Sequence, residues 1–525
     1  MKEQKGFGKG LSNVAQWIVA LISFLAFAFF SVVGLVQTCH VDIDFSKDNI
    51  EHVTFLNDNI LLNLAVLAVF LMLAVLLMRV SVKRKTAVLV GAVSIALSAA
   101  IGVWWVLSSK SLPSADSLRI ITAAQEVIKG NMQALTETFY FKTYPFQTGY
   151  LLFAEGFLRL FGSGALIPFQ LLNVLFVVAA EIAMLLITKE LFNDARVELL
   201  TAILLGLCIQ PMLLSTFLYG TLPGMALAIW SAYFVIRAMR TKKLAVLIPA
   251  LVLIALAIFL KKNFWIVLLA ESILLLLFVI REKKWLFVSF VAVAAALSIT
   301  LPMLSQKIYE EKAGEPFGKG TPQMAWLVTG FRDSSLCAGW YNGYTNNILM
   351  QNDYNYDATL AQCKLDFAER VDELIHRPVY LGSFFYHKIT SQWNEPAYQT
   401  IWSSATSDRS GEVSDLIESL SKGPASDAFN AYCNQLMQFV YIAMTVAFFV
   451  FLRKKEERSE ARMIIPTILV GAVLYHALFE AKSQYAIIYV PMMLPYAAYG
   501  MKRLSETVFH KKTEAAKPEA VKTEE

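Results

Sequence analysis

Asp116 is the first residue whose type and position suit chemistry, because it closely follows an apolar stretch long enough to cross a membrane. A carboxylate at the membrane edge is partly desolvated, which raises its basicity and fits it to take a proton from a hydroxyl nucleophile. Aspartate is also a favoured N-cap, and a helical pattern begins directly after Asp116. The sequence leaves both roles open, and they can coexist.

Three polar residues, Lys261, Lys262 and Asn263, separate two apolar stretches at a turn that the charge pattern places outside the cell. The positive-inside rule disfavours a basic pair at such a turn. Cations deep at an outer surface are costly without an anionic partner, and a polyprenyl phosphate or pyrophosphate supplies one. The alternative is that both lysines snorkel toward lipid headgroups.

A second charged turn lies between the last two apolar stretches and contains Glu480, Lys482, Gln484 and Tyr485. Charged side chains at membrane depth are candidates for function. Glu480 and Lys482 could instead pair only with each other. We take the four residues as candidates for substrate binding.

The composition indicates a membrane protein, since 57% of the 525 residues are hydrophobic and the mean hydropathy is +0.53. A helix needs about 20 apolar residues to cross the hydrocarbon core, and runs of that length recur along the chain. They predict an all-α membrane protein with about 12 transmembrane helices. The candidate spans are 14–36, 59–79, 86–107, 166–187, 197–215, 219–236, 244–260, 264–280, 285–304, 433–452, 463–478 and 485–501.

Basic residues cluster in alternate connections, which predicts a multi-pass protein of the cell membrane with both termini in the cytoplasm. The other connections, including 37–58, are acidic or neutral and are expected outside. The first apolar stretch lacks a small-residue cleavage site, so we expect it to be retained as a helix. The net charge of +5 follows from the cytoplasmic connections and indicates no nucleic-acid partner.

Two segments expected outside, 108–165 and 305–432, are too long to be mere connectors, and such loops often carry function. The first contains amphipathic stretches that suggest interfacial helices contacting membrane lipids. The second reads as a mostly helical insertion. Its aromatic residues Trp340, Tyr341 and Trp393 could stack against sugars or form its core. The expected domains are a transmembrane core at 1–304, the extracytoplasmic insertion at 305–432, C-terminal spans at 433–502 and a disordered cytoplasmic tail at 503–525.

Motifs for cofactors and metals are missing from the sequence, which contains no CxxC or HExxH spacing and no GxxxxGK[ST] or GxGxxG loop. We therefore expect no cofactor and no metal ligand in the site, although dependence on a divalent ion stays open. An activated donor must then arrive through the membrane. Cys337 and Cys363 could form a disulfide outside the cell or stay free thiols.

The order of these features resembles the GT-C membrane glycosyltransferases, above all the protein mannosyltransferase and aminoarabinose transferase group, glycosyltransferase family 39. The resemblance rests on Asp116 and on FYFKTYPFQTGYLLFAE at 139–155, which contains Lys142, Tyr144 and Gln147. It implies GT-C-like external interfacial helices, with Asp116 as the catalytic base and Lys142 in contact with the lipid phosphate.

Three further segments resemble Gram-positive bacterial membrane glycosyltransferases, namely GWYNGYT at 339–345, HKITSQWNEPAYQTIW at 387–402 and the stretch 476–500. The chain departs from the family pattern at two points. Thr143 and Tyr144 precede Pro145 where many members have Lys-Pro-Pro, and Asp116 is followed by serine rather than a second acid. The missing acidic pair puts a metal-dependent mechanism in doubt.

The expected function is the transfer of a sugar from a polyprenyl-phosphate donor to a cell-envelope glycan or teichoic acid on the extracytoplasmic face, with inversion of configuration. Asp116 would accept the hydroxyl proton, and Lys142, helped by Lys261, Lys262 or Lys482, would stabilise the leaving phosphate. The rivals are a lipid-linked saccharide flippase or transporter, a saccharide polymerase or ligase, and a non-enzymatic envelope scaffold. A transporter is expected to show internal repeats and charges near the midplane.

Overall fold

The computed structural model describes residues 2–44 and 50–515, and the described chain is mostly helical. Within these residues ten helical segments are long and apolar enough to cross a membrane, and all ten coincide with expected spans. They are α1 (Lys2–Val36), α2 (Ile60–Leu77), α3 (Arg84–Ser109), α7 (Leu166–Phe192), the run of α8 (Ala195–Leu207), α9 (Gln210–Leu213) and η3 (Leu214–Thr216), α10 (Thr221–Thr241), α12 (Trp265–Glu282), α13 (Val288–Ala313), α20 (Pro424–Arg453) and α21 (Glu460–Leu478).

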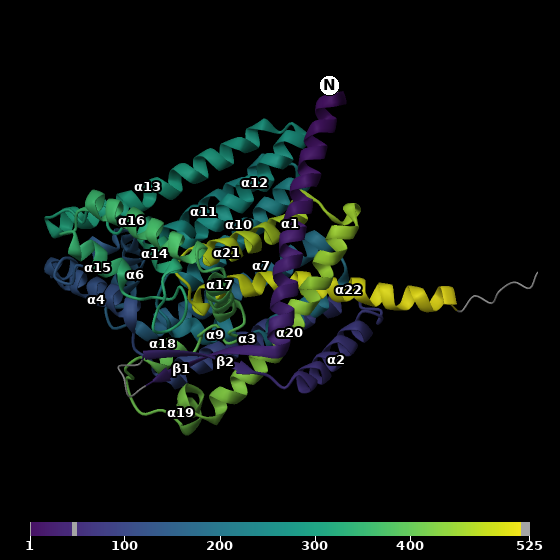
Figure 1. Ribbon diagram of the computed structural model, residues 1–525, viewed down its shortest axis with the longest axis horizontal. Coiled ribbons are helices and arrows are strands. Elements are labelled where there is room, and N and C mark those ends of the chain that lie inside the picture. The colour runs from purple at the N-terminus through teal and green to yellow at the C-terminus, as the bar shows by residue number, and fades with distance from the viewer. Residues whose placement is uncertain (1, 45–49, 516–525) are drawn as a thin grey trace, which may run out of the picture.

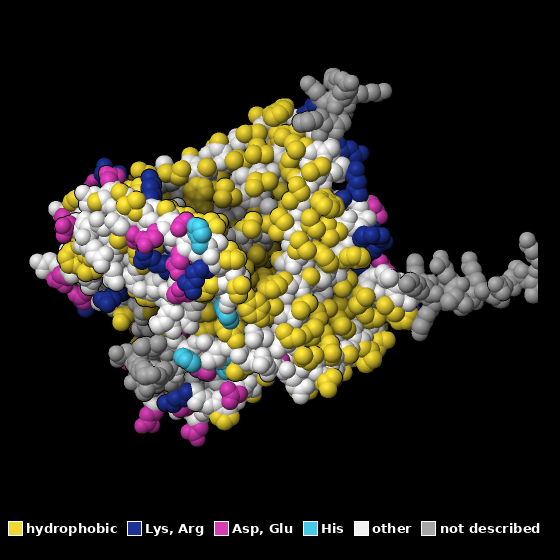
Figure 2. All heavy atoms as spheres, in the orientation of Figure 1, with side chains coloured by type: hydrophobic (Ala, Val, Ile, Leu, Met, Phe, Trp, Pro, Cys, Tyr) yellow, Lys and Arg dark blue, Asp and Glu magenta, His cyan; other side chains and the backbone are white. Residues whose placement is uncertain are grey.

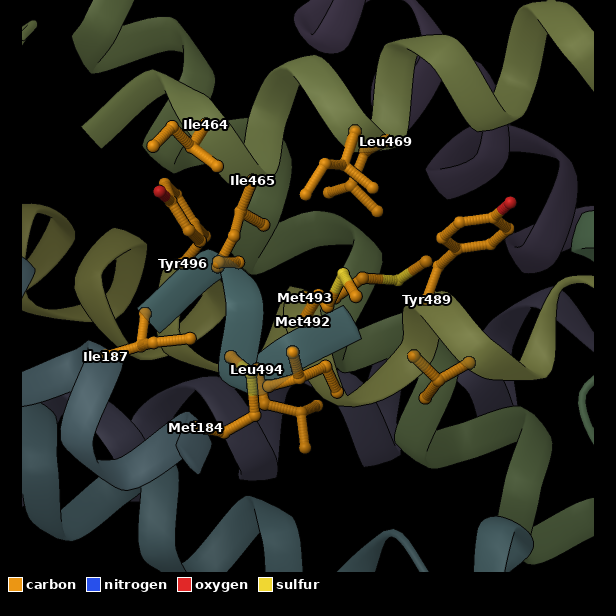
Figure 3. Close-up of a cluster of buried hydrophobic side chains, with 14 of the residues drawn as sticks. Met184, Ile187, Ile464, Ile465, Leu469, Tyr489, Met492, Met493, Leu494 and Tyr496 are labelled. Atoms are coloured by element: carbon orange, nitrogen blue, oxygen red, sulfur yellow. The ribbon is translucent and has the colours of Figure 1, made fainter. Parts of the chain in front are cut away.

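The two remaining expected spans are also helical. Turn η4 (Leu244–Val246) and α11 (Leu247–Leu260) form an apolar helix that is shorter than the ten. Helix α22 (Val490–Ala515) starts with a run that is almost fully buried as far as Met501. Figure 3 shows Met492, Met493 and Leu494 of α22 among side chains of α7 and α21. A helix that is apolar on all sides packs inside a bundle, so α22 is a central helix.

Local sequence sets where several helices begin. The side chains of Asn59, Asp194 and Ser459 each accept a hydrogen bond from a backbone N–H in the first turn of α2, α8 and α21. These N-caps satisfy donors that have no partner inside the helix. Helices α10 and α12 end at lysines in the left-handed conformation, Lys242 and Lys283, which stops the helical hydrogen-bond pattern.

The connection 37–58 contains a β-hairpin, which the all-helical expectation missed. Strands β1 (Gln37–Asp44) and β2 (Ile50–Asn57) pair antiparallel, with Gln37 opposite Asn57. Val41, Ile43 and Val53 are β-branched residues that alternate with polar ones, and this pattern favours a half-buried strand. The backbone N–H of Cys39 donates to the carbonyl of Asn394 at 3.0 Å, which fixes the hairpin to the insertion.

The segment 108–165 folds into short helices at one end of the bundle. They are α4 (Ala115–Lys129), η1 (Met132–Leu135), α5 (Tyr140–Thr143), η2 (Pro145–Gln147) and α6 (Thr148–Phe161). Buried apolar side chains of α4 and α6 form a second core together with Tyr309 of α13 and Phe317. Leu160 and Phe161 at the end of α6 are exposed, as expected for a helix that contacts lipid.

The insertion is helical, and it is shorter than expected because the transmembrane helices on both sides of it are longer than expected. Helix α13 continues to Ala313 and α20 begins at Pro424, so the connecting segment is shorter than 305–432. Its helices are α14 (Gln323–Phe331), α15 (Tyr344–Gln351), α16 (Tyr356–Ile375), α17 (Pro378–Trp393), α18 (Trp402–Ala405) and α19 (Asp415–Lys422). The backbone N–H of Thr321 donates to the carbonyl of Thr143 at 3.0 Å, which joins the two long segments.

These elements define two ends of the molecule. The hairpin, α4 and α14 to α19 lie together at one end, which we call the loop-rich end, and the N-terminus and the far end of α22 lie away from it (Figure 1). On the face that Figure 2 shows, hydrophobic side chains cover most of the surface between the ends, where a membrane would lie. The surface is hollowed between α13 and the lobe of α16 and α17.

Two expectations need adjustment at the level of single elements. Helix α22 runs to Ala515, so the first part of the tail expected to be disordered is helical, and residues 516–525 lie outside the described residues. Lys and Glu are good helix formers, and Lys502 and Arg503 both pair with Glu506 one turn later. Cys337 and Cys363 are free thiols, so the disulfide is not formed.

Candidate functional site

Asp116 lies at the centre of a group of charged side chains from three distant parts of the chain. Lys261 follows α11, and Lys482 precedes turn η8 (Ser483–Tyr485). Burial raises the pKa of the Asp116 carboxyl, whereas the charges of Lys261 and Lys482 lower it. Asp116 is nevertheless exposed by surface area. The side chain is thus surrounded by protein yet open to water, and we call the region of Asp116, Lys261 and Lys482 the charged recess.

Asp116 is in the first turn of α4, but it is not the cap. The N-cap is Ser114, whose side chain makes no capping bond. The carboxylate is therefore free to face Tyr140 and Tyr219, whose hydroxyls lower its pKa. The Tyr140 hydroxyl is buried and has no full hydrogen bond among the described residues, so its contact with Asp116 is loose. The Tyr219 hydroxyl accepts a hydrogen bond from Gln147.

Strained backbone surrounds this site. Ala115, next to Asp116, and Phe139, next to Tyr140, have φ values of 49° and 54°, in the left-handed region. Tyr398 and Gln399 have φ values of 51° and 49° and lie in the turn that faces Ser483. This conformation is energetically unfavourable for residues other than glycine, and such strain is often found at functional sites. Lys110, Asn193, Lys242 and Lys283 also have positive φ, but they end helices.

Lys261 is held in place by the close approach of two backbones. A Cβ atom at Gly220 would lie 2.1 Å from the carbonyl oxygen of Leu260 and 3.2 Å from the Cβ of Lys261, so only glycine fits. The Lys261 Nζ donates to the Thr221 hydroxyl at 2.7 Å and lies 4.8 Å from the centroid of the Tyr219 ring. Burial lowers the pKa of Lys261 to about 8, although the negative charge of Asp116 raises it.

Lys482 is positioned by the hairpin and by the insertion. Its ammonium forms an ion pair with Glu51 of β2, and both side chains are largely buried. The Nζ also lies 4.1 Å from the centroid of the Trp402 ring, a cation–π contact. Glu51 therefore neutralises part of the charge of Lys482.

A chain of polar groups continues from this cluster. Tyr485 donates to Glu480 at 2.8 Å, and burial raises the pKa of Glu480 to about 7. Tyr144 donates to the side-chain oxygen of Asn346, whose amide donates to the Tyr341 hydroxyl at 3.2 Å. Burial raises the pKa of both Tyr144 and Tyr341, and the charge of Asp116 contributes to both shifts, which indicates that the two rings lie near the carboxylate.

The remaining candidates have partners of their own. Lys142 forms an ion pair with Glu315 at 3.0 Å. Lys262 lies 4.3 Å from the centroid of the Phe146 ring, and Asn263 follows it in turn η5 (Lys262–Phe264). Gln484 is buried, and its side-chain nitrogen has no partner among the described residues.

Two of the three candidate aromatic residues belong to the core. Trp393 is 1% exposed, and its ring stacks on Phe30 with centroids 5.4 Å apart. Trp340 is 0% exposed and donates from Nε1 to Ser391 at 2.8 Å. Tyr341 is 46% exposed. Of the two interpretations that the sequence left open, core packing matches the surroundings of both tryptophans, and only Tyr341 is open to a sugar.

Sequence reasoning missed four residues of this region. Tyr140 stands inside a motif that had been singled out, and Tyr219 directly precedes the glycine that admits Lys261. The role of Glu51 could not be predicted from the sequence, because its contact with Lys482 depends on the β-hairpin, which was not expected. Lys388 is 0% exposed and donates to the carbonyl of Gly330; burial lowers its pKa to about 7. The burial of Lys388 could not be predicted from the sequence, because the helix that contains it is mixed in polarity.

The fold defines a multi-pass helical membrane protein, and its charged recess takes Asp116 from a long connecting segment and Lys261 and Lys482 from short turns. Within the described residues no three His, Cys, Asp or Glu side chains are grouped so that they could hold a metal ion. No protein-family model and no curated protein matches the chain. The chemistry of the recess must therefore be argued from its residues.

Proposed function

We propose that the protein is a membrane glycosyltransferase that moves a sugar from a polyprenyl-phosphate donor to a hydroxyl group of a cell-envelope glycan or teichoic acid. The observation that carries the proposal is the meeting of Asp116 with Lys261 and Lys482 in one recess. An inverting displacement needs a carboxylate that takes up a proton and cations that hold a phosphate. The motif resemblance to GT-C glycosyltransferases supports the same class of donor.

In the proposed reaction the acceptor hydroxyl attacks the anomeric carbon from the face opposite the phosphate. The bond from carbon to phosphate oxygen breaks as the glycosidic bond forms, and the configuration inverts. Asp116 takes the hydroxyl proton, and its raised pKa makes it a stronger base than an ordinary aspartate. Lys261 and Lys482 stabilise the negative charge on the departing polyprenyl phosphate.

The arrangement also suits a donor that arrives sideways from the bilayer. Lys262 is exposed and Lys261 is partly so, and both directly follow an apolar helix. A phosphate carried on a lipid travels at this depth, while its polyprenyl chain stays among acyl chains. We place the site on the outer face of the cell membrane, as the distribution of basic residues indicates.

The decisive experiment supplies purified protein in nanodiscs with synthetic polyprenyl-phosphate sugars. We expect release of polyprenyl phosphate, and a loss of about 10²-fold or more in Asp116→Asn, since general bases contribute that much. Asp415→Asn is a matched control, because Asp415 is also in the first turn of a helix at the loop-rich end. Normal turnover in a folded Asp116→Asn protein would show that Asp116 is not the base. Release only from polyprenyl-pyrophosphate oligosaccharides would identify a polymerase or ligase.

One observation favours a transporter as the second candidate. Glu181 of α7 and Glu271 of α12 are almost fully buried inside the bundle, and each has a carboxylate oxygen with no partner among the described residues. Ionisable groups inside membrane helices often mark ion or proton pathways. A transporter would lose movement of lipid-linked sugar across proteoliposomes in Glu181→Gln or Glu271→Gln and keep it in Asp116→Asn. The glycosyltransferase proposal predicts that the first two variants retain sugar transfer.

A further inference from the structure

A cavity of about 330 Å³ lies at the loop-rich end beside the charged recess. Its walls come from strand β1, from the segment 395–405 and from the region where α19 meets α20. The volume falls within the range of about 300–1,000 Å³ that is usual for small-molecule sites. No residue assigned so far to base or phosphate binding lines it.

Two residues connect this cavity to the recess. Trp402 lines the cavity, and its ring is the one that lies 4.1 Å from the Lys482 ammonium. Gln399 also lines the cavity, and its side-chain oxygen accepts a hydrogen bond from Ser483 at 3.1 Å. Lys482 in turn acts on Asp116. The cavity is therefore linked to the carboxylate through Trp402 and Lys482.

Two residues of the cavity wall carry buried hydrogen-bond donors that have no partner among the described residues. Gln399 is 5% exposed, and its amide nitrogen has no partner among the described residues. The indole N–H of Trp402 also lacks a partner within the described chain. Glu395, by contrast, is fully engaged, because its two oxygens accept bonds from the backbone of Ala397 and Gln399 at 3.0 and 2.8 Å. It fixes the strained turn that presents Gln399.

The charge of the lining excludes an anionic ligand. Asp42 and Asp427 contribute carboxylates, and the basic side chain in the wall, Lys422, pairs with Glu418 at 2.6 Å. A phosphate would be repelled here, so the cavity does not suit the donor's phosphate. Aromatic rings with amide and hydroxyl groups recognise neutral sugars, whose faces are apolar and whose edges carry hydroxyls.

We propose that this cavity binds the acceptor as a neutral saccharide chain, with Trp402, Gln399 and Asn430 in its wall. This inference rests on the proposed function. The reacting hydroxyl is presented to Asp116 beyond Trp402, while the preceding sugar units occupy the cavity. The donor's phosphate is held by Lys261, and Lys482, which contacts Trp402, lies between the two substrates. Donor and acceptor thus reach the carboxylate from different directions, as an inverting displacement requires.

The test fills the cavity without touching the charged recess. Ser426 of α20 lines the cavity, whereas Ala428, two residues later on the same helix, is exposed and does not. The acceptor probe is the neutral oligosaccharide fraction that hydrofluoric acid releases from the envelope of the source cells. We expect Ser426→Trp to raise the KM for this fraction about tenfold or more, with kcat within about twofold, because the lost binding is common to the ground state and the transition state. Ala428→Trp should match the wild type.

A measurement on the wild type keeps the test decisive if Ser426→Trp does not fold. Hydroxyl-radical footprinting should show that the oligosaccharides protect Trp402 and Phe429, both cavity residues, and that polyprenyl phosphate does not. An unchanged KM in folded Ser426→Trp, or oligosaccharide binding without protection of these rings, would overturn the proposal. Failure of the proposed function is recognised separately, because the wild type would then release no polyprenyl phosphate from any donor.

Discussion

Lys261 gives the sharpest pH prediction. Burial lowers the pKa of its ammonium to about 8, although Asp116 opposes the shift. Lysine loses its positive charge as the pH rises through its pKa, so the group that stabilises the leaving phosphate disappears above pH 8. Arginine keeps its charge throughout this range. We therefore expect the wild type to lose activity at high pH and Lys261→Arg to resist that loss.

The size of the effect follows from the fraction of charged lysine. With a pKa of about 8, roughly one tenth of Lys261 is protonated at pH 9 and about one hundredth at pH 10, and kcat/KM should fall in proportion. Lys261→Met removes the charge at every pH and should cost about 10²–10³-fold. It also removes a cation that lowers the pKa of Asp116, so the acidic limb of its profile should move to higher pH.

The assay measures release of polyprenyl phosphate between pH 5 and 10 at donor concentrations below KM. Lys307→Met is the matched control, because Lys307 is a lysine of α13 that is 73% exposed. Its profile should equal that of the wild type. The reasoning is refuted if the wild type and Lys261→Arg share the same basic limb, or if wild-type activity stays level up to pH 10.

Three further predictions concern the turn that carries Lys261 and two of the candidate aromatic residues. Gly220→Ala should reduce turnover about tenfold or more, because the new Cβ would lie 2.1 Å from the carbonyl of Leu260 and displace the turn that carries Lys261. Gly156→Ala, where nothing lies within 4 Å, should leave turnover unchanged in the same assay. Trp393→Ala should cost about 3–5 kcal/mol of stability, measured as a lower melting temperature, because its ring is buried. Tyr341→Ala should keep the melting temperature and change a substrate KM; a large loss of stability there would show a core role.

The transmembrane part of the fold could be predicted well from the sequence. Apolar runs of bilayer length are a strong and local signal, and ten of them became helices of the expected position. The hairpin was missed because its alternating pattern, in strands as short as Gln37–Asp44, is weak beside the apolar runs. The N-terminal extension of α20 was missed because Pro424–Tyr432 is mixed in polarity, so only its later residues form an apolar run.

The candidate site could be predicted only in part. Asp116, Lys261 and Lys482 each stood out by charge at membrane depth, and this criterion needs no knowledge of the fold. Glu51 did not stand out, because its role depends on a contact with Lys482, which lies 431 positions later in the sequence. Lys142 was chosen from a motif and not from depth, and the structure places it against Glu315.

The central claim is that the Asp116 recess faces the outside of the cell. Arg119 is exposed on α4, one turn beyond Asp116, and Lys455 is exposed in a basic connection expected inside. Each is changed to cysteine in a chain that lacks the five native cysteines, and intact cells are treated with a membrane-impermeant maleimide. The account predicts labelling of Arg119→Cys in intact cells and of Lys455→Cys only after permeabilisation. The reverse pattern would place the recess in the cytoplasm and contradict it.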